Sequence, residues 1–532
     1  MKLLKKIIMT LKIKNIVLII WVTLFTSAIS FGQITSNEID GLVTKAMERF
    51  NVAGVAVALV KDGKIIHEKG YGVQSIDTKV SVDEHTNFQI ASNSKAFTTA
   101  ALAILVDEGK ISWKDKVKTF IPEFKMYNDY VTENFLIEDL LCHRSGLGLG
   151  VGDLMGFPDG SDFTIKDVLN SFQYFKPVSA FRTQYDYDNL LYWVAGELVT
   201  RVSGMSWEQF VESKIMEPIK MNNSYCSADM KKGNNFAMPH TTETENDKIK
   251  QISLFKEIIN GAAGGIFSNV HDMSKWMLMH LNQGKYGDNL DKQLFSKDRQ
   301  KEMWTIHTVI EANTNPRYNT HFSGYGLGWF LSDTKGNLEV SHTGGLPGML
   351  SIVTMYPDLN LGIVILTNTE NGGGGLFSSI TNTISDSYLG LDDFGWIEKN
   401  VAWMNQQRST GDEVSNKVWK KVEAEKNTAI RNDDYIGIYE DKWFGKVEVF
   451  LKDKQLWIKC HRSPRLNGPM AFYNANTFAI KWEYQDMNAD AFAMFSLDEN
   501  GKAQRIKMKG ISPNIDFSFD FHDLDLIRVD NN

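Results

Sequence analysis

The chain has 532 residues, long enough for three or four domains of ordinary size and at least one large hydrophobic core. Its residues are 43% hydrophobic and 23% charged, which excludes a disordered or low-complexity polymer. A net charge of −8 argues against a general nucleic-acid binder, which is normally basic. Three cysteines are too few for a disulfide scaffold, and the usual zinc spacings are missing. We therefore expect no required disulfide, no metal and no cofactor.

The first 32 residues have the pattern of a secretory signal peptide. Residues 1–14 carry five lysines and no acid, and residues 15–37 carry no charge. Small residues precede the expected cut, with Ser30 at −3 and Gly32 at −1. An uncleaved anchor is the alternative, because the apolar run is long enough to span a membrane. Cleavage would take the net charge from −8 to −13. We predict an exported protein, periplasmic or secreted, with no membrane contact beyond this leader.

The next part of the chain alternates strand and helix patterns. Asp62-Gly63 separates two strand-like runs, 54–61 and 64–71, which is a strong hairpin signal. A helix that is apolar almost all round begins near Ser92 and is predicted to be buried. A mostly helical stretch follows, and then three strand-like runs at residues 338–342, 348–356 and 361–367. This order predicts an α+β arrangement whose antiparallel sheet is built from both ends, with helices inserted between. The glycines at 372–375 are interpreted as a flexible loop.

The C-terminal part of the chain has a different texture. Residues 395–430 are charged and rich in Gln and Lys, which predicts a linker helix. Eight short alternating runs follow at close spacing: YIGIYE, KVEVFLKD, QLWIKCH, TFAIKWEY, AFAMFSLD, QRIKMKG, IDFSFDF and LDLIRV. Such a series indicates a small antiparallel barrel or sandwich.

Ser-x-x-Lys is a candidate catalytic pattern with a physical basis. A Ser at a helix N-terminus and a Lys one turn later lie on the same face. The free N–H groups of that helix end can hold an oxyanion, and its positive potential favours a neutral amine that can act as a base. Three matches occur, about the number that chance allows: Ser92–Lys95, Ser253–Lys256 and Ser332–Lys335. Only Ser92 follows a strand-like run and opens an apolar helix; Ser253 lies in a mixed segment and Ser332 runs into a turn.

Two later segments complete a pattern. Tyr187-Asp188-Asn189 precedes a helical run, and His342-Thr343-Gly344-Gly345 ends a strand-like run. The order Ser-x-x-Lys, Tyr-x-Asn, [Lys/His]-Thr-Gly is that of penicillin-recognising serine acyl-transferases. The sequence resembles the class C β-lactamase-like serine hydrolases, a family that includes D,D-peptidases, D-aminopeptidases and esterases. The resemblance covers roughly residues 40–390, and residues 433–529 look like the small lipocalin-like barrel of some members.

The resemblance implies four segments and a fold. They are a signal peptide (1–32), a β-lactamase-like hydrolase domain (33–394), a linker helix (395–430) and a lipocalin-like β-barrel domain (431–532). The implied fold is α+β, a β-lactamase/transpeptidase-like antiparallel sheet flanked by helices with a large helical insertion, followed by the small all-β barrel.

The resemblance also implies a role for each motif residue. Ser92 is the nucleophile, Lys95 and Tyr187 share general-base duty, and an acyl-enzyme is hydrolysed by water. The implied substrate-binding residues are Asn189, His342, Thr343 and Gly344. Backbone N–H groups of Ser92 and Gly345 form the oxyanion hole. The partner is a small-molecule or peptide substrate with an amide or ester bond.

Two positions depart from the family pattern. His342 stands where β-lactamases of this family usually carry Lys, and a histidine is mostly neutral at pH 7. We therefore expect weak recognition of a substrate carboxylate and poor β-lactamase activity. Asp188 stands where Ser or Ala is commoner, and an inward carboxylate would raise the pKa of Tyr187. The alternatives are a true β-lactamase or D,D-carboxypeptidase, and a non-catalytic penicillin-binding-like scaffold.

Overall fold

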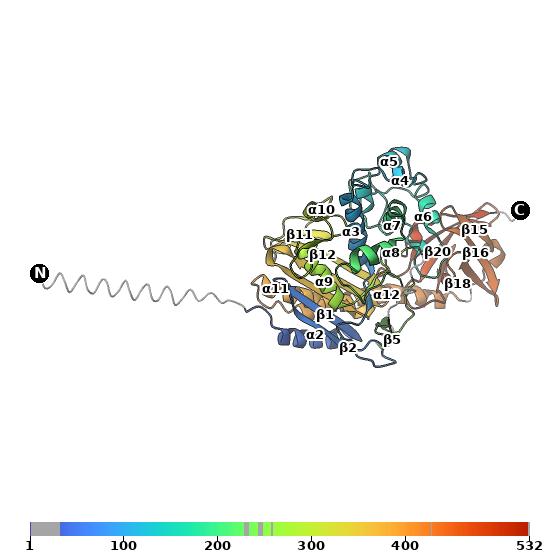
Figure 1. Ribbon diagram of the computed structural model, residues 1–532. Helices are drawn as coiled ribbons and strands as arrows, with labels where there is room; N and C mark the ends of the chain where they lie inside the picture. Colours follow the sequence, from blue (N-terminus) through green and yellow to red (C-terminus); the bar gives the residue numbers. More distant parts are fainter. Residues whose placement is uncertain (2–31, 228–232, 243–247, 257–258, 427, 530–532) are drawn as a thin grey trace.

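The chain folds into an α+β part and a β-barrel that lie side by side (Figure 1). The computed structural model describes these parts of the chain: Met1 and residues 32–227, 233–242, 248–256, 259–426 and 428–529. The predicted leader and its cleavage lie outside the described residues. Among those described, no helix is long and apolar enough to cross a membrane.

The α+β part is built on an eight-stranded antiparallel sheet. Its strands, in spatial order, are β2 (Lys64–Gly72), β1 (Gly54–Lys61), β14 (Leu361–Thr367), β13 (Met349–Tyr356), β12 (Asn337–Leu346), β11 (Phe330–Thr334), β10 (Ser323–Tyr325) and β9 (Thr308–Ile310). The predicted hairpin at Asp62-Gly63 is confirmed, and both turn residues have positive φ, as a tight hairpin requires. β1 and β14 come from opposite ends of this region and pair directly, as the sequence predicted.

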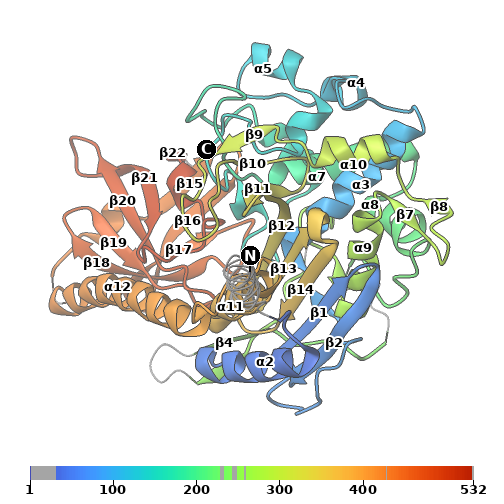
Figure 2. The same ribbon diagram turned by 90° about the vertical axis from the view of Figure 1, so that its left-hand side faces the viewer.

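Helices cover both faces of the sheet. β1 is apolar throughout because both of its faces are buried: Val55, Val57 and Leu59 face one core, and the residues between them face the other. α2 and α11 close the first core (Figure 2). The helices are α2 (Ser36–Phe50), α3 (Ser94–Asp107), α4 (Val117–Phe120), α5 (Asp129–Asn134), α6 (Ile165–Ser171), α7 (Leu190–Ser203), α8 (Trp207–Val211), α9 (Val270–Leu281), α10 (Lys297–Met303), α11 (Glu370–Tyr388) and α12 (Trp396–Ala424).

The remaining strands of the α+β part form three small two-stranded sheets. They pair β3 (Phe88–Gln89) with β6 (Phe267–Ser268), β4 (His240–Thr242) with β5 (Ile249–Gln251), and β7 (Lys285–Tyr286) with β8 (Lys292–Gln293). α3 is buried over nearly its whole length, as its apolar sequence predicted.

The interpretation of residues 372–375 as a flexible loop is wrong. These glycines form the first turns of α11. A side chain at Gly372 would overlap the carbonyl oxygen of Phe50, and one at Gly375 would overlap the Phe50 ring. Gly372 and Gly375 let α11 approach the end of α2 closely, and this contact between distant parts of the sequence outweighs the low helix propensity of glycine.

The C-terminal part is a closed antiparallel barrel of eight strands. The strands are β15 (Gly437–Asp441), β16 (Gly445–Lys452), β17 (Gln455–Cys460), β18 (Asn467–Asn474), β19 (Thr477–Ile480), β20 (Ala491–Leu497), β21 (Ala503–Gly510) and β22 (Leu526–Val529). Seven of the eight predicted runs overlap these strands. The run IDFSFDF at 515–521 is not a strand; it lies in the connection between β21 and β22. The eighth strand of the barrel is β18, between β17 and β19, which the sequence did not predict.

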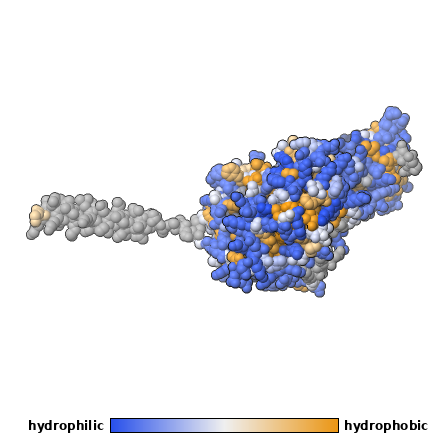
Figure 3. Space-filling view, turned by 45° about the horizontal axis from the view of Figure 1, so that its top comes forward, coloured by the Kyte–Doolittle hydropathy of each residue, from blue (hydrophilic) through white to orange (hydrophobic). Residues whose placement is uncertain are grey.

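α12 joins the two parts. It packs on α11 and α2 near its start and on β18 and β19 of the barrel near its end (Figure 2). The barrel also contacts the α+β part directly, through hydrogen bonds from residues 462–465 and 516–520 to residues 152–167. The face in Figure 3 is mostly hydrophilic, with hydrophobic residues gathered near its middle.

Candidate active site

Ser92 lies in a tight turn between a short strand and a buried helix. β3 leads into a 3-10 turn, η1 (Ala91–Asn93), which continues directly into α3. Ala91 has φ of 48°, a left-handed conformation that costs a non-glycine residue about 1 kcal/mol or more. This sharp turn presents the Ser92 side chain to a pocket, and α3 places Lys95 one turn further on.

Lys95 is completely buried and its amine lies against Ser92. Nζ is 3.0 Å from Ser92 Oγ, 2.7 Å from Asn189 Oδ1 and 2.8 Å from the carbonyl oxygen of Ala263. A neutral amine has two N–H bonds and one lone pair. When the two N–H bonds donate to the Asn189 and Ala263 oxygens, the lone pair is directed at Ser92, so this arrangement can accept the Ser92 proton.

Tyr187 covers the same pair of residues. Its ring centroid is 4.8 Å from Lys95 Nζ, and the pocket that Ser92 faces is lined by Tyr187 as well. Burial raises the pKa of Tyr187 well above its ordinary value, while a hydrogen bond with Ser92 acts in the opposite direction. Burial is therefore the main cause of the raised pKa, and the predicted effect of Asp188 is not among the larger contributions. The Asp188 carboxylate instead accepts the backbone N–H of Leu191, at the start of α7 (3.3 Å).

His342 lies within β12, which continues to Leu346, so the His-Thr-Gly motif is part of the strand and not its end. Its Nδ1 lies 2.5 Å from the carbonyl oxygen of Thr343, so Nδ1 carries the proton. Its Nε2 lies 2.9 Å from the Tyr325 hydroxyl, which therefore donates to it. Burial lowers the pKa of His342 to about 3, and the ammonium form of Lys95 adds a smaller contribution in the same direction. Both ring nitrogens are occupied, and the ring is neutral.

Gly344 has a steric reason to be glycine. A side chain at this position would overlap the carbonyl oxygen of Ile90, immediately before η1. The absence of a Cβ lets β12 run close to the turn that carries Ser92. Ser351 Oγ donates to the same Ile90 oxygen at 2.7 Å, which fixes the turn against the sheet.

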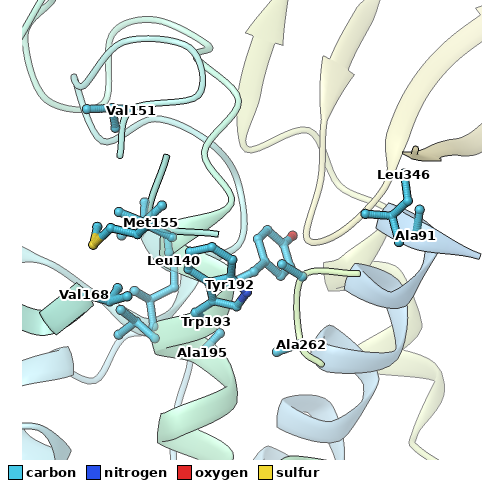
Figure 4. Packing of buried hydrophobic residues seen from close by; sticks show 14 of the residues in the cluster. Ala91, Leu140, Val151, Met155, Val168, Tyr192, Trp193, Ala195, Ala262 and Leu346 are labelled. Carbon is cyan, nitrogen blue, oxygen red and sulfur yellow. The ribbon is translucent and has the colours of Figure 1, made fainter. Parts of the chain in front are cut away.

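The motif residues meet around a pocket of about 350 Å³. Ser92, Tyr187, Asn189, His342, Thr343 and Gly345 line it, while Lys95 and Gly344 lie behind this surface. Most other lining residues are apolar or aromatic: Ala91, Leu149, Gly156, Phe157, Tyr185, Trp193, Phe255, Ala263, Gly264, Phe330 and Leu346. Figure 4 shows the buried hydrophobic cluster beside the pocket, with Ala91 and Leu346 together and Tyr192 and Trp193 on α7.

Three lining residues come from the barrel, and sequence reasoning missed them. Asp516, Phe517 and Ser518 lie in the segment that was predicted to be a barrel strand. Its alternating pattern is typical of a strand, so no local signal distinguished it. The other two Ser-x-x-Lys serines do not line the pocket: Ser332 lies in β11, and Ser253 donates to Asp486 of the barrel at 2.9 Å.

A metal-binding cluster is not found among the described residues. The three cysteines are buried free thiols, and none lines the pocket. The polar side chains that line the pocket come from the three motifs, from the barrel segment, and from Tyr185 and Trp193.

Comparison with known families gives two matches that together cover most of the chain. The profile of the family described as Beta-lactamase matches residues 39–381, more than half of the chain. The chain belongs to the Beta-lactamase family. A domain of unknown function, DUF3471, matches residues 422–528, the region that forms the barrel.

Relatives of this Beta-lactamase family chain come from fungi and bacteria. It is 26% identical to unguisins hydrolase ungD' of Aspergillus campestris over 393 residues, 72% of this chain and 71% of that protein. It is 25% identical to protein flp of Staphylococcus aureus (strain MW2) over 342 residues, 63% of this chain and 64% of that protein.

Solved structures agree with the fold of this family member. An octameric penicillin-binding protein homologue from Pyrococcus abyssi aligns with 93% of this chain and all of that one, at a TM-score of 0.60 and 20% identity. SurE aligns with 93% of this chain and 99% of that one, at a TM-score of 0.55 and 15% identity. At these identities the likeness shows the fold, and it covers both parts of the molecule.

Proposed function

We propose that this Beta-lactamase family chain is a serine hydrolase that cleaves amide or ester bonds through an acyl-enzyme. The observation that carries the proposal is the 3.0 Å contact between Lys95 Nζ and Ser92 Oγ, inside a pocket where Lys95 is fully buried. A lysine placed only for solubility or surface charge would not be buried against a serine hydroxyl. The hydrolase name of the fungal relative supports the same class of activity.

The proposed reaction has two steps. Ser92 Oγ attacks the substrate carbonyl while its proton moves to Lys95. Tyr187 gives its hydroxyl proton to the leaving group and takes up the proton that Lys95 received. The backbone N–H groups of Ser92 and Gly345 stabilise the oxyanion. Water then attacks the acyl-enzyme and gives a proton to Lys95, which returns it to Ser92 Oγ as the acid product leaves. Asn189 and Thr343 hold the substrate on either side of the scissile bond.

His342 sets which substrates are favoured. A true β-lactamase or a D,D-carboxypeptidase must bind a substrate carboxylate, which a cation does best. The His342 ring is neutral, and its two nitrogens are already hydrogen-bonded to Thr343 and Tyr325. We therefore propose peptides, amides or esters that lack this carboxylate. The predicted leader further leads us to propose that the reaction takes place outside the cytoplasm.

Covalent labelling tests the proposal. A fluorophosphonate should label the wild type stoichiometrically, and Ser92→Ala should lose labelling and lower kcat for p-nitrophenyl esters by about 10⁴-fold or more. Ser332→Ala is the matched control, because it alters a Ser-x-x-Lys serine that does not line the pocket. If the wild type is neither labelled nor active on any ester or amide tried, the scaffold alternative is correct and the proposal is wrong.

Turnover of penicillins tests whether the neutral His342 weakens recognition of a substrate carboxylate. Penicillins should be hydrolysed with a kcat/KM about 100-fold or more below that of the best ester or peptide. Equal or better turnover of common penicillins would show that the neutral His342 does not limit carboxylate recognition, and would favour the β-lactamase alternative.

A further inference from the structure

One segment of the barrel packs into the α+β part beside the pocket. The connection between β21 and β22 carries Ser518 and Asp520, both buried. The two carboxylate oxygens of Asp520 accept the backbone N–H groups of Gly152 (2.7 Å) and Leu154 (2.9 Å). Ser518 Oγ donates to Asp153 Oδ2 at 2.9 Å. Three hydrogen bonds from the barrel thus hold the turn that carries Asp153.

Asp153 is one step from the proposed catalytic lysine. Asp153 Oδ2 accepts Asn189 Nδ2 at 2.8 Å, and Asn189 Oδ1 accepts Lys95 Nζ at 2.7 Å. An asparagine amide can present either its oxygen or its NH₂ group on a given side. Because Asp153 offers Asn189 an acceptor, the NH₂ group turns to Asp153 and the oxygen turns to Lys95. The reverse orientation would place N–H groups against the amine of Lys95.

We propose that Asp153 is a positioning residue for Lys95, and that the barrel segment 516–520 holds Asp153 in place. The barrel is then part of the active site, and its docking controls the rate of acylation. The inference rests on the proposed function. It adds a chain of hydrogen bonds that begins at Ser518 of the barrel and runs through Asp153 and Asn189 to Lys95, which contacts Ser92.

The two buried carboxyl groups at the barrel contact, Asp153 and Asp520, fit a positioning role better than a packing role. Two fully buried carboxyl groups lie around one turn, an arrangement that is costly compared with apolar packing. Burial raises the pKa of Asp153 well above its ordinary value, so the group can act as a neutral acid whose carbonyl oxygen still accepts from Asn189. A neutral amide at position 153 would offer an equivalent carbonyl oxygen, so the role needs an acceptor and not a charge.

Four variants of the full-length protein test the proposal, with p-nitrophenyl acetate as substrate and a fluorophosphonate to count active sites. Asp153→Ala should lower kcat per labelled site about 10- to 100-fold with KM changed less than about threefold. Asp153→Asn should recover activity to within about fivefold of the wild type. Ser518→Ala should lower kcat about three- to tenfold. Ser463→Ala, a buried barrel serine whose hydroxyl has no partner among the described residues, is the control.

The outcomes separate this inference from the proposed function. A wild type without labelling or activity refutes both. A labelled wild type with Asp153→Ala at the wild-type rate refutes only the positioning role, and equal losses in Asp153→Ala and Asp153→Asn do the same. If Asp153→Ala fails to fold by circular dichroism, Ser518→Ala decides: its kcat must fall relative to Ser463→Ala, or the role of the barrel is refuted.

Discussion

The α+β part and the barrel contribute to the same pocket in different ways. The α+β part supplies the proposed reacting groups from regular elements or from the residues directly before them. Ser92 lies in η1, Lys95 in the first turn of α3, Tyr187 just before α7, and His342 inside a central strand. The barrel supplies Asp516, Phe517 and Ser518 from an irregular connection between strands. Groups that must hold one geometry lie on helices and strands or directly beside them, whereas the enclosing residues Asp516 and Phe517 lie on a loop.

The contact between the barrel and the α+β part differs in composition from the packing inside the α+β part. One buried apolar cluster extends from the sheet and its helices into the barrel, and a second lies between the sheet, α2 and α11. At the barrel contact, charged groups are prominent: Arg462 forms a two-pronged ion pair with Asp167 and contacts Asp162, and Arg465 pairs with Asp159. Aromatic pairs such as Phe163 with Phe444 add packing. Because the Arg462–Asp167 pair is partly exposed, acid or salt should weaken the barrel contact more than the apolar packing of the sheet.

The largest effect is expected in the α+β part, from Gly344→Ala. The added methyl group would overlap the Ile90 carbonyl oxygen and push β12 away from the turn that carries Ser92. A shift of about 1 Å at a reacting group costs about 100-fold in rate, so we expect kcat/KM for esters to fall by about that factor or more. Steady-state kinetics measure the loss. Gly374→Ala is the control, because a Cβ there meets nothing within 4 Å; an equal loss in both variants would refute the steric argument.

The next effect is a pH dependence of stability from Asp188→Asn. Burial raises the pKa of Asp188 to about 7, compared with about 4 for an exposed carboxyl. Between about pH 4 and 7 the folded protein keeps a proton that the unfolded chain has released, so folding becomes less favourable as pH rises through this window. The variant removes that loss and should gain about 4 kcal/mol relative to the wild type above pH 7.

Denaturant unfolding at pH 4, 5.5 and 8 measures the Asp188 effect. The difference between variant and wild type should grow with pH and level off above 7. Asp291→Asn, at an exposed aspartate, should show no such trend. A difference that is constant with pH would mean that Asp188 does not titrate in this range.

Arg462→Ala tests how much the Arg462–Asp167 ion pair contributes to docking of the barrel on the α+β part. Arg462 holds the pKa of Asp167 down, to about 2, by hydrogen bonding and charge. A lowered pKa contributes stability that is present above about pH 4 and lost as pH falls towards 2. Because both side chains are partly exposed, the pair should contribute only about 1 kcal/mol to docking. The protection of the Gly152 and Leu154 amides, whose N–H groups bond to Asp520, is measured by hydrogen exchange relative to the intrinsic rate at each pH. This protection should fall in the variant, and below pH 4 in the wild type.

A control keeps the docking prediction specific. Arg431→Ala removes an exposed arginine whose ion pair is with Asp434, three residues away, and it should leave exchange at Gly152 and Leu154 unchanged. Faster exchange throughout the α+β part of Arg462→Ala would show global destabilisation and would contradict the view that the barrel loosens separately.

The sequence predicted the fold class and the motif residues for clear physical reasons. The α3 helix is apolar all round, the Asp62-Gly63 hairpin has its turn residues, and each motif sits on a local pattern. Prediction from the sequence was wrong where contacts between residues far apart in the sequence determine the local structure. Gly372 and Gly375 form a helix because Phe50 lies against them, and residues 515–521 leave the barrel although their alternation is typical of a strand. The contact of Ser518 with Asp153 joins residues 365 positions apart, and neither residue carries a local sign of it.

The smallest expected effect concerns the wall itself. The Phe517 ring packs edge-on against the Tyr187 ring, 5.8 Å between centroids, and approaches Gly150, where a Cβ would lie 2.7 Å from it. Phe517→Ala removes this wall while leaving the hydrogen bonds of Ser518 and Asp520 in place, so it should change selectivity and not the chemistry. We expect kcat/KM for bulky acyl esters to rise about three- to tenfold relative to acetyl esters, with kcat for acetyl esters nearly unchanged. Phe322→Ala, which removes an exposed ring away from the pocket, should leave the ratio as it is. If Phe517→Ala instead lowers kcat for every ester alike, the segment acts on the reacting groups through Phe517 itself, and the division between a rigid catalytic part and an enclosing barrel loop does not hold.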